Sequence, residues 1–138
     1  MVILDKFNLM VYFTRYNNDY FGGILPYPEF KFKKSYRTFG YFSCRYTPDY
    51  EMYDCLLEIS DRYNYTEKQF RDIMVHEMIH YYLAYTKADL AIEHGKQFKN
   101  MANYLNSMFG LNITPYINDK EYIKKPSFSL GYLASFLI

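Results

Sequence analysis

Residues 76–80, near the middle of the chain, read His-Glu-Met-Ile-His. In a helix, residues four positions apart lie on the same face, about one turn from each other. His76 and His80 can therefore bind one metal ion together if this stretch is helical, and Glu77 then lies close to both imidazoles. The spacing predicts a helix and, on that helix, a metal site.

The residues before this pattern supply a start for the helix. Thr66 and Gln69 have the spacing of a capping box, in which each side chain accepts a hydrogen bond from the other residue's main-chain amide. We therefore expect a helix over residues 67–86. Its expected apolar face consists of Phe70, Ile73, Met74, Met78, Ile79 and Tyr82.

Two further helices are expected, one before and one after this central helix. The first covers residues 3–17 and ends before a segment that contains two glycines and two prolines, 22–28. The other covers residues 93–109, and Gly110 ends it. The first helix is expected to face the core with Ile3, Phe7, Met10, Val11 and Thr14, and the last with Phe98, Met101, Ala102, Leu105, Met108 and Phe109.

Three short segments between the first two helices have the character of strands: residues 29–34, 39–46 and 53–60. The first alternates charged and aromatic residues, and the second is rich in aromatic residues. Turn-forming residues at 35–38 and 47–50 separate the three segments. We expect a three-stranded antiparallel meander.

The last part of the chain gives weaker signals. Pro115 and Pro126 limit helix formation, so we expect turns there, with a short ordered segment near 119–124. Residues 128–138 are apolar but too few to span a membrane, so we expect them to face the core or a partner. The layout predicts an α+β fold, formed as one domain over residues 1–138.

Composition excludes several classes of protein. The 16 Lys and Arg residues nearly balance the 15 Asp and Glu residues, so no overall charge draws the chain to nucleic acid or to an anionic membrane. Two cysteines, Cys44 and Cys55, are too few for a disulfide-rich scaffold or a four-cysteine zinc site. We expect them to be half-buried strand thiols, with one disulfide as the alternative. Neither a signal-peptide pattern nor an apolar stretch of membrane-spanning length is present, so we expect a cytoplasmic protein.

A third metal ligand has to come from outside the helical pair. His94 is the remaining histidine, and it lies at the beginning of the last expected helix. Three histidines would leave the fourth position of a tetrahedral zinc ion open, as in catalytic sites. Glu93 and Asp89 are the alternative third ligands. The related pattern with Gly and His seven and ten residues after the first histidine is excluded, because those positions hold Leu83 and Thr86.

These residues have a definite chemistry if a metal is bound. Glu77 can take a proton from a metal-activated water and pass it to the leaving amine, which amounts to hydrolysis of a peptide bond. A strand next to the site could pair with an extended peptide substrate, and a tyrosine could stabilise the oxyanion. Asp72, Asp89 and Glu93 are candidates for orienting the imidazoles.

Further blocks of sequence resemble the SprT-like family, the zinc metallopeptidase domain shared with Spartan proteases. Residues 94–98 (HGKQF) are similar to the family's His-Gly-x-x-Phe block, and residues 16–26 (YNNDYFGGILP) to its entry segment. Residues 37–42 (RTFGYF) are similar to its glycine-containing strand. The blocks occur in family order over residues 16–98. The resemblance implies a zincin-like core in which His76, His80 and His94 bind zinc and Glu77 is the catalytic acid and base.

The resemblance also implies a role near DNA, because Spartan-type proteases digest proteins crosslinked to DNA. The chain departs from many bacterial members in having no cysteine after Cys55, so we expect no C-terminal zinc ribbon. Residues 31–37 (KFKKSYR) interleave basic and aromatic side chains, which suits single-stranded nucleic acid; an edge strand kept soluble by lysines is the alternative. Two other functions stay open: a gluzincin-like peptidase that cuts a specific regulator, and a non-catalytic zinc-binding interaction module.

Overall fold

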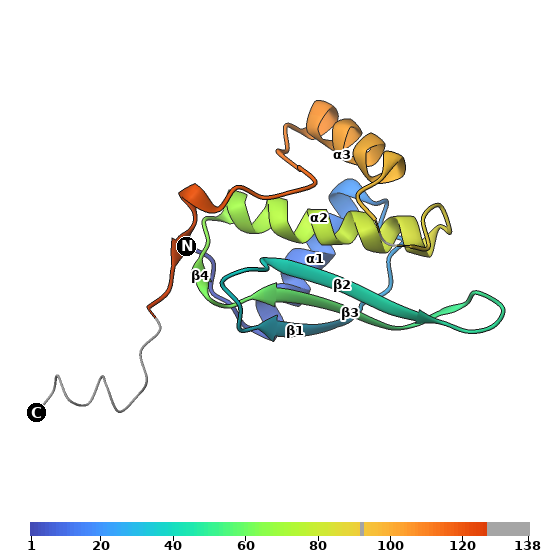
Figure 1. Cartoon of the computed structure of the whole chain (residues 1–138), viewed down its shortest axis with the longest axis horizontal. Helices are drawn as coiled ribbons and strands as arrows, with labels where there is room; N and C mark the ends of the chain where they lie inside the picture. Colours follow the sequence, from blue (N-terminus) through green and yellow to red (C-terminus); the bar gives the residue numbers. More distant parts are fainter. Residues whose placement is uncertain (92, 127–138) are drawn as a thin grey trace, which may run out of the picture.

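The computed structural model describes residues 1–91 and 93–126, and Figure 1 shows how its helices and strands are arranged. The helix α2 lies between the main sheet and α3, while α1 packs against α2 and β1. The expected α+β class is confirmed. The elements are α1 (Lys6–Tyr20), β1 (Glu29–Lys33), β2 (Gly40–Tyr46), β3 (Met52–Ser60), β4 (Tyr63–Asn64), α2 (Glu67–Tyr85), α3 (Lys96–Phe109), the 3-10 turn η1 (Asp119–Glu121) and β5 (Ile123–Lys124).

The main sheet is mixed, so the expected antiparallel meander is wrong. Its strand order is β1-β3-β2. The turn at 47–50 closes an antiparallel hairpin between β2 and β3, as expected. β1, however, pairs with β3 in parallel, from Glu29 opposite Leu56 to Lys33 opposite Ser60. The segment 34–39 therefore carries the chain past the end of β3, where the Ser60 amide donates to the Phe39 carbonyl over 2.7 Å. Both β1 and β2 are edge strands.

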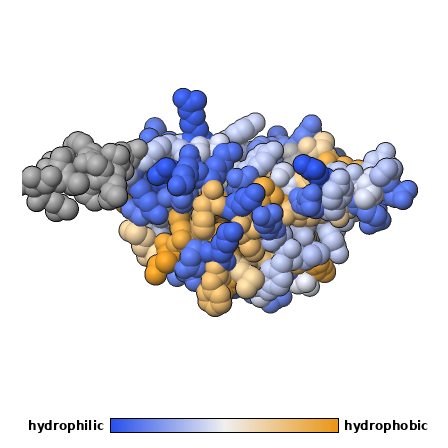
Figure 2. Space-filling view, turned by 90° about the horizontal axis from the view of Figure 1, so that it is seen from below, coloured by the Kyte–Doolittle hydropathy of each residue, from blue (hydrophilic) through white to orange (hydrophobic). Residues whose placement is uncertain are grey.

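The helix α1 is present but presents a different face to the core. It begins at Lys6, where the Asp5 carboxylate accepts a hydrogen bond from the Asn8 amide at 2.7 Å and caps the helix. The buried residues are Leu9, Phe13, Tyr16 and Asn17. Four residues expected in the core are exposed instead: Ile3 by 71%, Phe7 by 69%, Met10 by 41% and Val11 by 40%. Figure 2 shows apolar residues gathered on part of the surface seen from below the sheet.

The central helix α2 follows the sequence-based expectation closely. Thr66 and Gln69 form both hydrogen bonds of the capping box, at 3.1 and 3.0 Å. Phe70, Ile73, Met74, Met78 and Ile79 are fully buried. Aromatic contacts tie α2 to its neighbours, since the Tyr81 ring stacks on Phe42 of β2 at 4.9 Å. Because α2 is packed on both sides, the side chains in its middle are held firmly in place.

The C-terminal half differs from expectation in detail. α3 begins at Lys96 rather than at residue 93, with Gly95 as its N-cap, and Gly110 ends it in the left-handed conformation with φ of 69°. Met108 and Phe109, expected in the core, are 63% and 46% exposed. The segment near 119–124 forms η1 and β5, and β5 pairs with β4. The expectation for residues 128–138 lies outside the described residues.

Two expectations about composition can be compared with the fold. Cys44 and Cys55 are free, half-buried thiols on β2 and β3, as expected. Within residues 1–91 and 93–126, none of the helices is both long and apolar enough to cross a membrane.

Candidate metal centre

Three histidines meet on the side of α2 that faces α3. One ring nitrogen from each of His76, His80 and His94 lies within 4.8 Å of the others, so the group could hold a metal ion. His76 Nε2 and His94 Nε2 are 3.0 Å apart. Each residue offers a nitrogen ligand of the kind that zinc prefers.

The fold explains why these histidines meet. His76 and His80 are one turn apart on α2, and their ring centroids are 5.2 Å apart. His94 lies outside a helix, in the connection that precedes α3. The fully buried ring of Phe98, on the first turn of α3, contacts all three imidazoles with centroid distances of 4.7, 4.7 and 4.9 Å. Phe98 therefore fixes the position of α3, and with it His94, against α2.

The alternative third ligands do not join this group. Among the described residues, the cluster of possible metal ligands contains the three histidines and neither Asp89 nor Glu93. The Asp89 carboxylate instead accepts a hydrogen bond from the Ala91 amide at 3.1 Å. Glu93, next to His94, is exposed.

A main-chain carbonyl orients His76. Its Nδ1 lies 2.9 Å from the carbonyl oxygen of Thr114. Since a carbonyl can only accept, Nδ1 carries the proton and the Nε2 lone pair is left free for a metal. Asp72, one of the three candidate carboxylates for this role, is instead paired with Arg71 at 3.0 Å. Sequence reasoning missed Thr114 because any residue supplies a carbonyl, so no residue type marks the position.

The imidazoles are held in the neutral form that binds metals. Burial, together with the nearby His80 and His94, lowers the pKa of His76 to about 3. Burial and His94 lower the pKa of His80 to about 4, and burial lowers that of His94. His80 Nδ1 is buried without a hydrogen-bond partner among the described residues. Because an unpartnered buried nitrogen is costly, metal coordination by this cluster would be favourable, and the donor set fits zinc.

Glu77 lies beside the histidines but outside the group of possible ligands. Its side chain is almost buried, and its Oε2 lies 3.9 Å from His76 Nε2. Burial raises the pKa of the Glu77 carboxyl to about 8. A carboxyl whose pKa lies near neutral pH can both take and give a proton, which is what acid and base catalysis requires.

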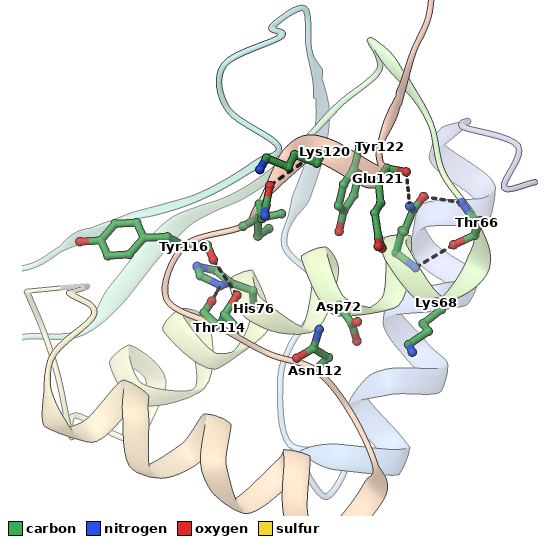
Figure 3. A pocket seen from close by; sticks show the side chains of 13 residues that line it. Thr66, Lys68, Asp72, His76, Asn112, Thr114, Tyr116, Lys120, Glu121 and Tyr122 are labelled. Carbon is green, nitrogen blue, oxygen red and sulfur yellow. Dashed lines mark hydrogen bonds between the residues drawn. The ribbon is translucent and has the colours of Figure 1, made fainter.

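A polar cavity opens next to His76. It has a volume of about 620 Å³ and lies between the N-terminal half of α2 and residues 112–122. Figure 3 shows Glu121 and Tyr122 extending from above toward Asp72 on α2. Burial, with Asp72 and Glu121 nearby, raises the pKa of Tyr122 to about 12. The largely exposed ring of Tyr116 contacts His94 with centroids 5.4 Å apart.

A comparison with protein families finds a match over most of the chain. Residues 9–117, well over half of the chain, match the family model described as the SprT-like family. This stretch contains the three histidines, Glu77 and Thr114. A search of curated proteins finds no match.

Proposed function

The chain belongs to the SprT-like family, and from this premise we propose that it is a zinc-dependent endopeptidase with Glu77 as its general base. Family membership makes it a metallopeptidase-type domain. The observation that carries the proposal is the convergence of His76, His80 and His94 on one point, with the buried carboxyl of Glu77 beside them.

Each residue of the site has a proposed part. His76, His80 and His94 would hold the zinc ion, and Thr114 would keep His76 in the tautomer that binds it. When bound, zinc would supply Lewis-acid chemistry at a water molecule and at the substrate carbonyl. Glu77 would take a proton from the attacking water molecule at a carboxylate oxygen and deliver it to the nitrogen of the leaving amine. Tyr116, next to His94, is the proposed hydroxyl donor to the oxyanion.

The shape of the site suits an extended protein or peptide substrate. β2 is an edge strand that begins beside Glu77. Its outer main-chain groups can pair with a substrate strand. The cavity beside His76 has room for a substrate side chain. These features favour cleavage within a chain rather than removal of a terminal residue.

Action on proteins associated with DNA is a narrower form of the proposal. In the basic and aromatic segment 31–37, Lys31 lies 3.9 Å from Glu29, and β1 is an edge strand. Lys33 lies over the ring of Tyr41, 5.2 Å from its centroid. These contacts support the alternative, in which the lysines protect an edge strand. Lys34 and Arg37 would then be the residues that bind phosphate groups. Fluorescence anisotropy with a single-stranded oligonucleotide at low salt, with a Lys34→Ala/Arg37→Ala variant beside the wild type, tests this form.

Metal content and cleavage together test the main proposal. Elemental analysis should find about one zinc per chain in the wild type and in Glu77→Gln, and none in His80→Ala. An unfolded protein substrate should be cut by the zinc-loaded wild type, with fragments identified by mass spectrometry, and not by Glu77→Gln. Equal cleavage by both would refute the role of Glu77. Zinc binding without cleavage of any substrate would favour the non-catalytic zinc-binding module.

A further inference from the structure

Gly40 lies where the edge strand comes closest to α2. It is the first residue of β2 and pairs with Ile59 of β3. Side chains alternate between the two faces of a strand, and Phe42, two residues on, is buried against Tyr81 of α2. Position 40 therefore faces α2 as well, and it does so at Glu77.

Glu77 fills the space that a side chain at position 40 would need. A Cβ atom at Gly40 would lie 2.9 Å from Glu77 Cγ, 3.0 Å from Oε2 and 3.3 Å from Cδ. Carbon atoms in proteins pack at about 3.5–4.0 Å, so even alanine would force the Glu77 side chain or the strand to move. The Glu77 side chain is only 7% exposed, so it has little room to move.

Backbone conformation gives no competing reason for a glycine here. Among the described residues, the glycines with positive φ are Gly22, Gly23 and Gly110, and Gly40 is not one of them. A residue with a side chain could therefore adopt the conformation of Gly40. What the position requires is the absence of a Cβ atom.

We propose that Gly40 is a positioning residue for Glu77: the missing side chain lets the β2 backbone act as a wall against which the carboxyl is held beside the histidines. This role rests on the proposed function, because Glu77 is placed there as the general base. A proton can be transferred only within hydrogen-bond reach, and a displacement of about 1 Å can cost about a hundredfold in rate. A methyl group at position 40 would cause a displacement of that size.

The contact can be tested without any assay of activity. Urea unfolding of the metal-free protein is compared for Gly40→Ala in three backgrounds, with Glu, Gln or Ala at position 77. Gln has the same atoms as Glu at Cγ and Cδ, so Gly40→Ala should lower the unfolding midpoint equally in both. Ala removes the three atoms nearest to the new methyl group, so the lowering of the midpoint should be lost in that background. An equal shift in all three backgrounds would overturn the proposal.

Gly95 offers a matched control. It also lacks a positive φ, but a Cβ atom there would meet nothing within 4 Å. Gly95→Ala should therefore shift the midpoint by the same small amount whatever residue occupies position 77. The effect of Gly95→Ala could instead depend on the residue at position 77 as strongly as the effect of Gly40→Ala does. The comparison would then not report a local contact, and the proposal would be overturned.

Kinetics then test positioning itself. Zinc-loaded Gly40→Ala should keep about one zinc per chain and a KM close to that of the wild type, while kcat falls by about a hundredfold. An unchanged kcat would overturn the positioning role even if the unfolding cycle shows the contact. An inactive wild type would refute the proposed function instead, and the unfolding cycle would still decide whether Gly40 makes room for Glu77.

Discussion

His76 donates its Nδ1 proton to the main-chain carbonyl of Thr114 across 2.9 Å. This bond joins the middle of α2 to the segment that returns from α3, 38 residues further along the chain. The segment is itself anchored by Asn106. The side-chain NH₂ of Asn106 donates to the Ile113 carbonyl at 2.9 Å, and the side-chain oxygen of Asn106 accepts from the Ile113 amide at 2.8 Å. Asn106 therefore positions the residue immediately before Thr114.

We predict that Asn106→Ala weakens zinc binding, by no more than the roughly 10–100-fold that losing a group which directly orients a ligand costs. Freed from Asn106, Thr114 would hold the tautomer and ring angle of His76 less firmly. Competition with a chromophoric chelator measures the affinity. Thr114→Ala should bind zinc as the wild type does, because the carbonyl remains.

Asn103 provides the control for this prediction. It lies on the same helix and is exposed, so Asn103→Ala should leave the zinc affinity unchanged. If Asn106→Ala binds zinc as tightly as Asn103→Ala, the segment from 111 to 114 does not depend on Asn106 for its position.

The helix that carries the site could be predicted from sequence because its signals are local. The capping residues Thr66 and Gln69, the helical period and the histidine spacing all lie within one stretch. The placement of His94 beside that helix depends instead on Phe98 packing under three rings. The sequence could suggest His94 by elimination. It could not predict the contact of the Thr114 carbonyl with His76 or the packing of Gly40 against Glu77, because both depend on the main chain.

The sheet shows the limit of local reasoning more clearly. The alternation of β1 is partly reflected in its burial, since Phe30 is buried between the exposed Glu29 and Lys31. Alternation is the same in parallel and antiparallel strands, so it does not determine which neighbour a strand pairs with or in which direction. The pairing of β1 with β3 rather than with β2 joins segments that are not adjacent in sequence. Pairing of that kind is decided by packing of the whole domain.

The two faces of α1 lead to a prediction about stability. Phe7 and Phe13 both belong to helical apolar patterns, but they point about 120° apart, because six residues correspond to about 600° of helical rotation. Phe13 is fully buried and packs edge-on against Phe30 at 5.6 Å, whereas Phe7 is 69% exposed. Phe13→Ala should cost about 3–5 kcal/mol of unfolding free energy.

Phe7→Ala is the matched control and should change the unfolding free energy by less than about 0.5 kcal/mol. Both values come from urea unfolding. The opposite ranking would mean that the helix packs on its other face, as the sequence pattern first suggested.

The capping box at the start of α2 should contribute measurably to stability. Thr66→Ala removes the oxygen that accepts from the Gln69 amide at 3.1 Å, and we expect a loss of about 1 kcal/mol. Thr66→Ser keeps that oxygen and should retain most of the stability. Thermal unfolding of the three proteins measures the difference, and equal losses in the Ala and Ser variants would show that the hydroxyl is not what matters.

The thiol of Cys55 should be unreactive in the folded protein. Burial, reinforced by the nearby Cys44, raises the pKa of Cys55 to about 11. The thiolate is the reactive form, and at pH 8 about one molecule in a thousand would carry it, compared with roughly one in four for a free thiol of pKa about 8.5. Alkylation of the wild type by iodoacetamide, with the Cys55 peptide followed by mass spectrometry, should therefore be about two-hundredfold slower in the folded protein than in urea. The rate should rise about tenfold per pH unit between pH 8 and 10, and a folded-state rate equal to the unfolded one would show that this part of β3 opens freely to solvent.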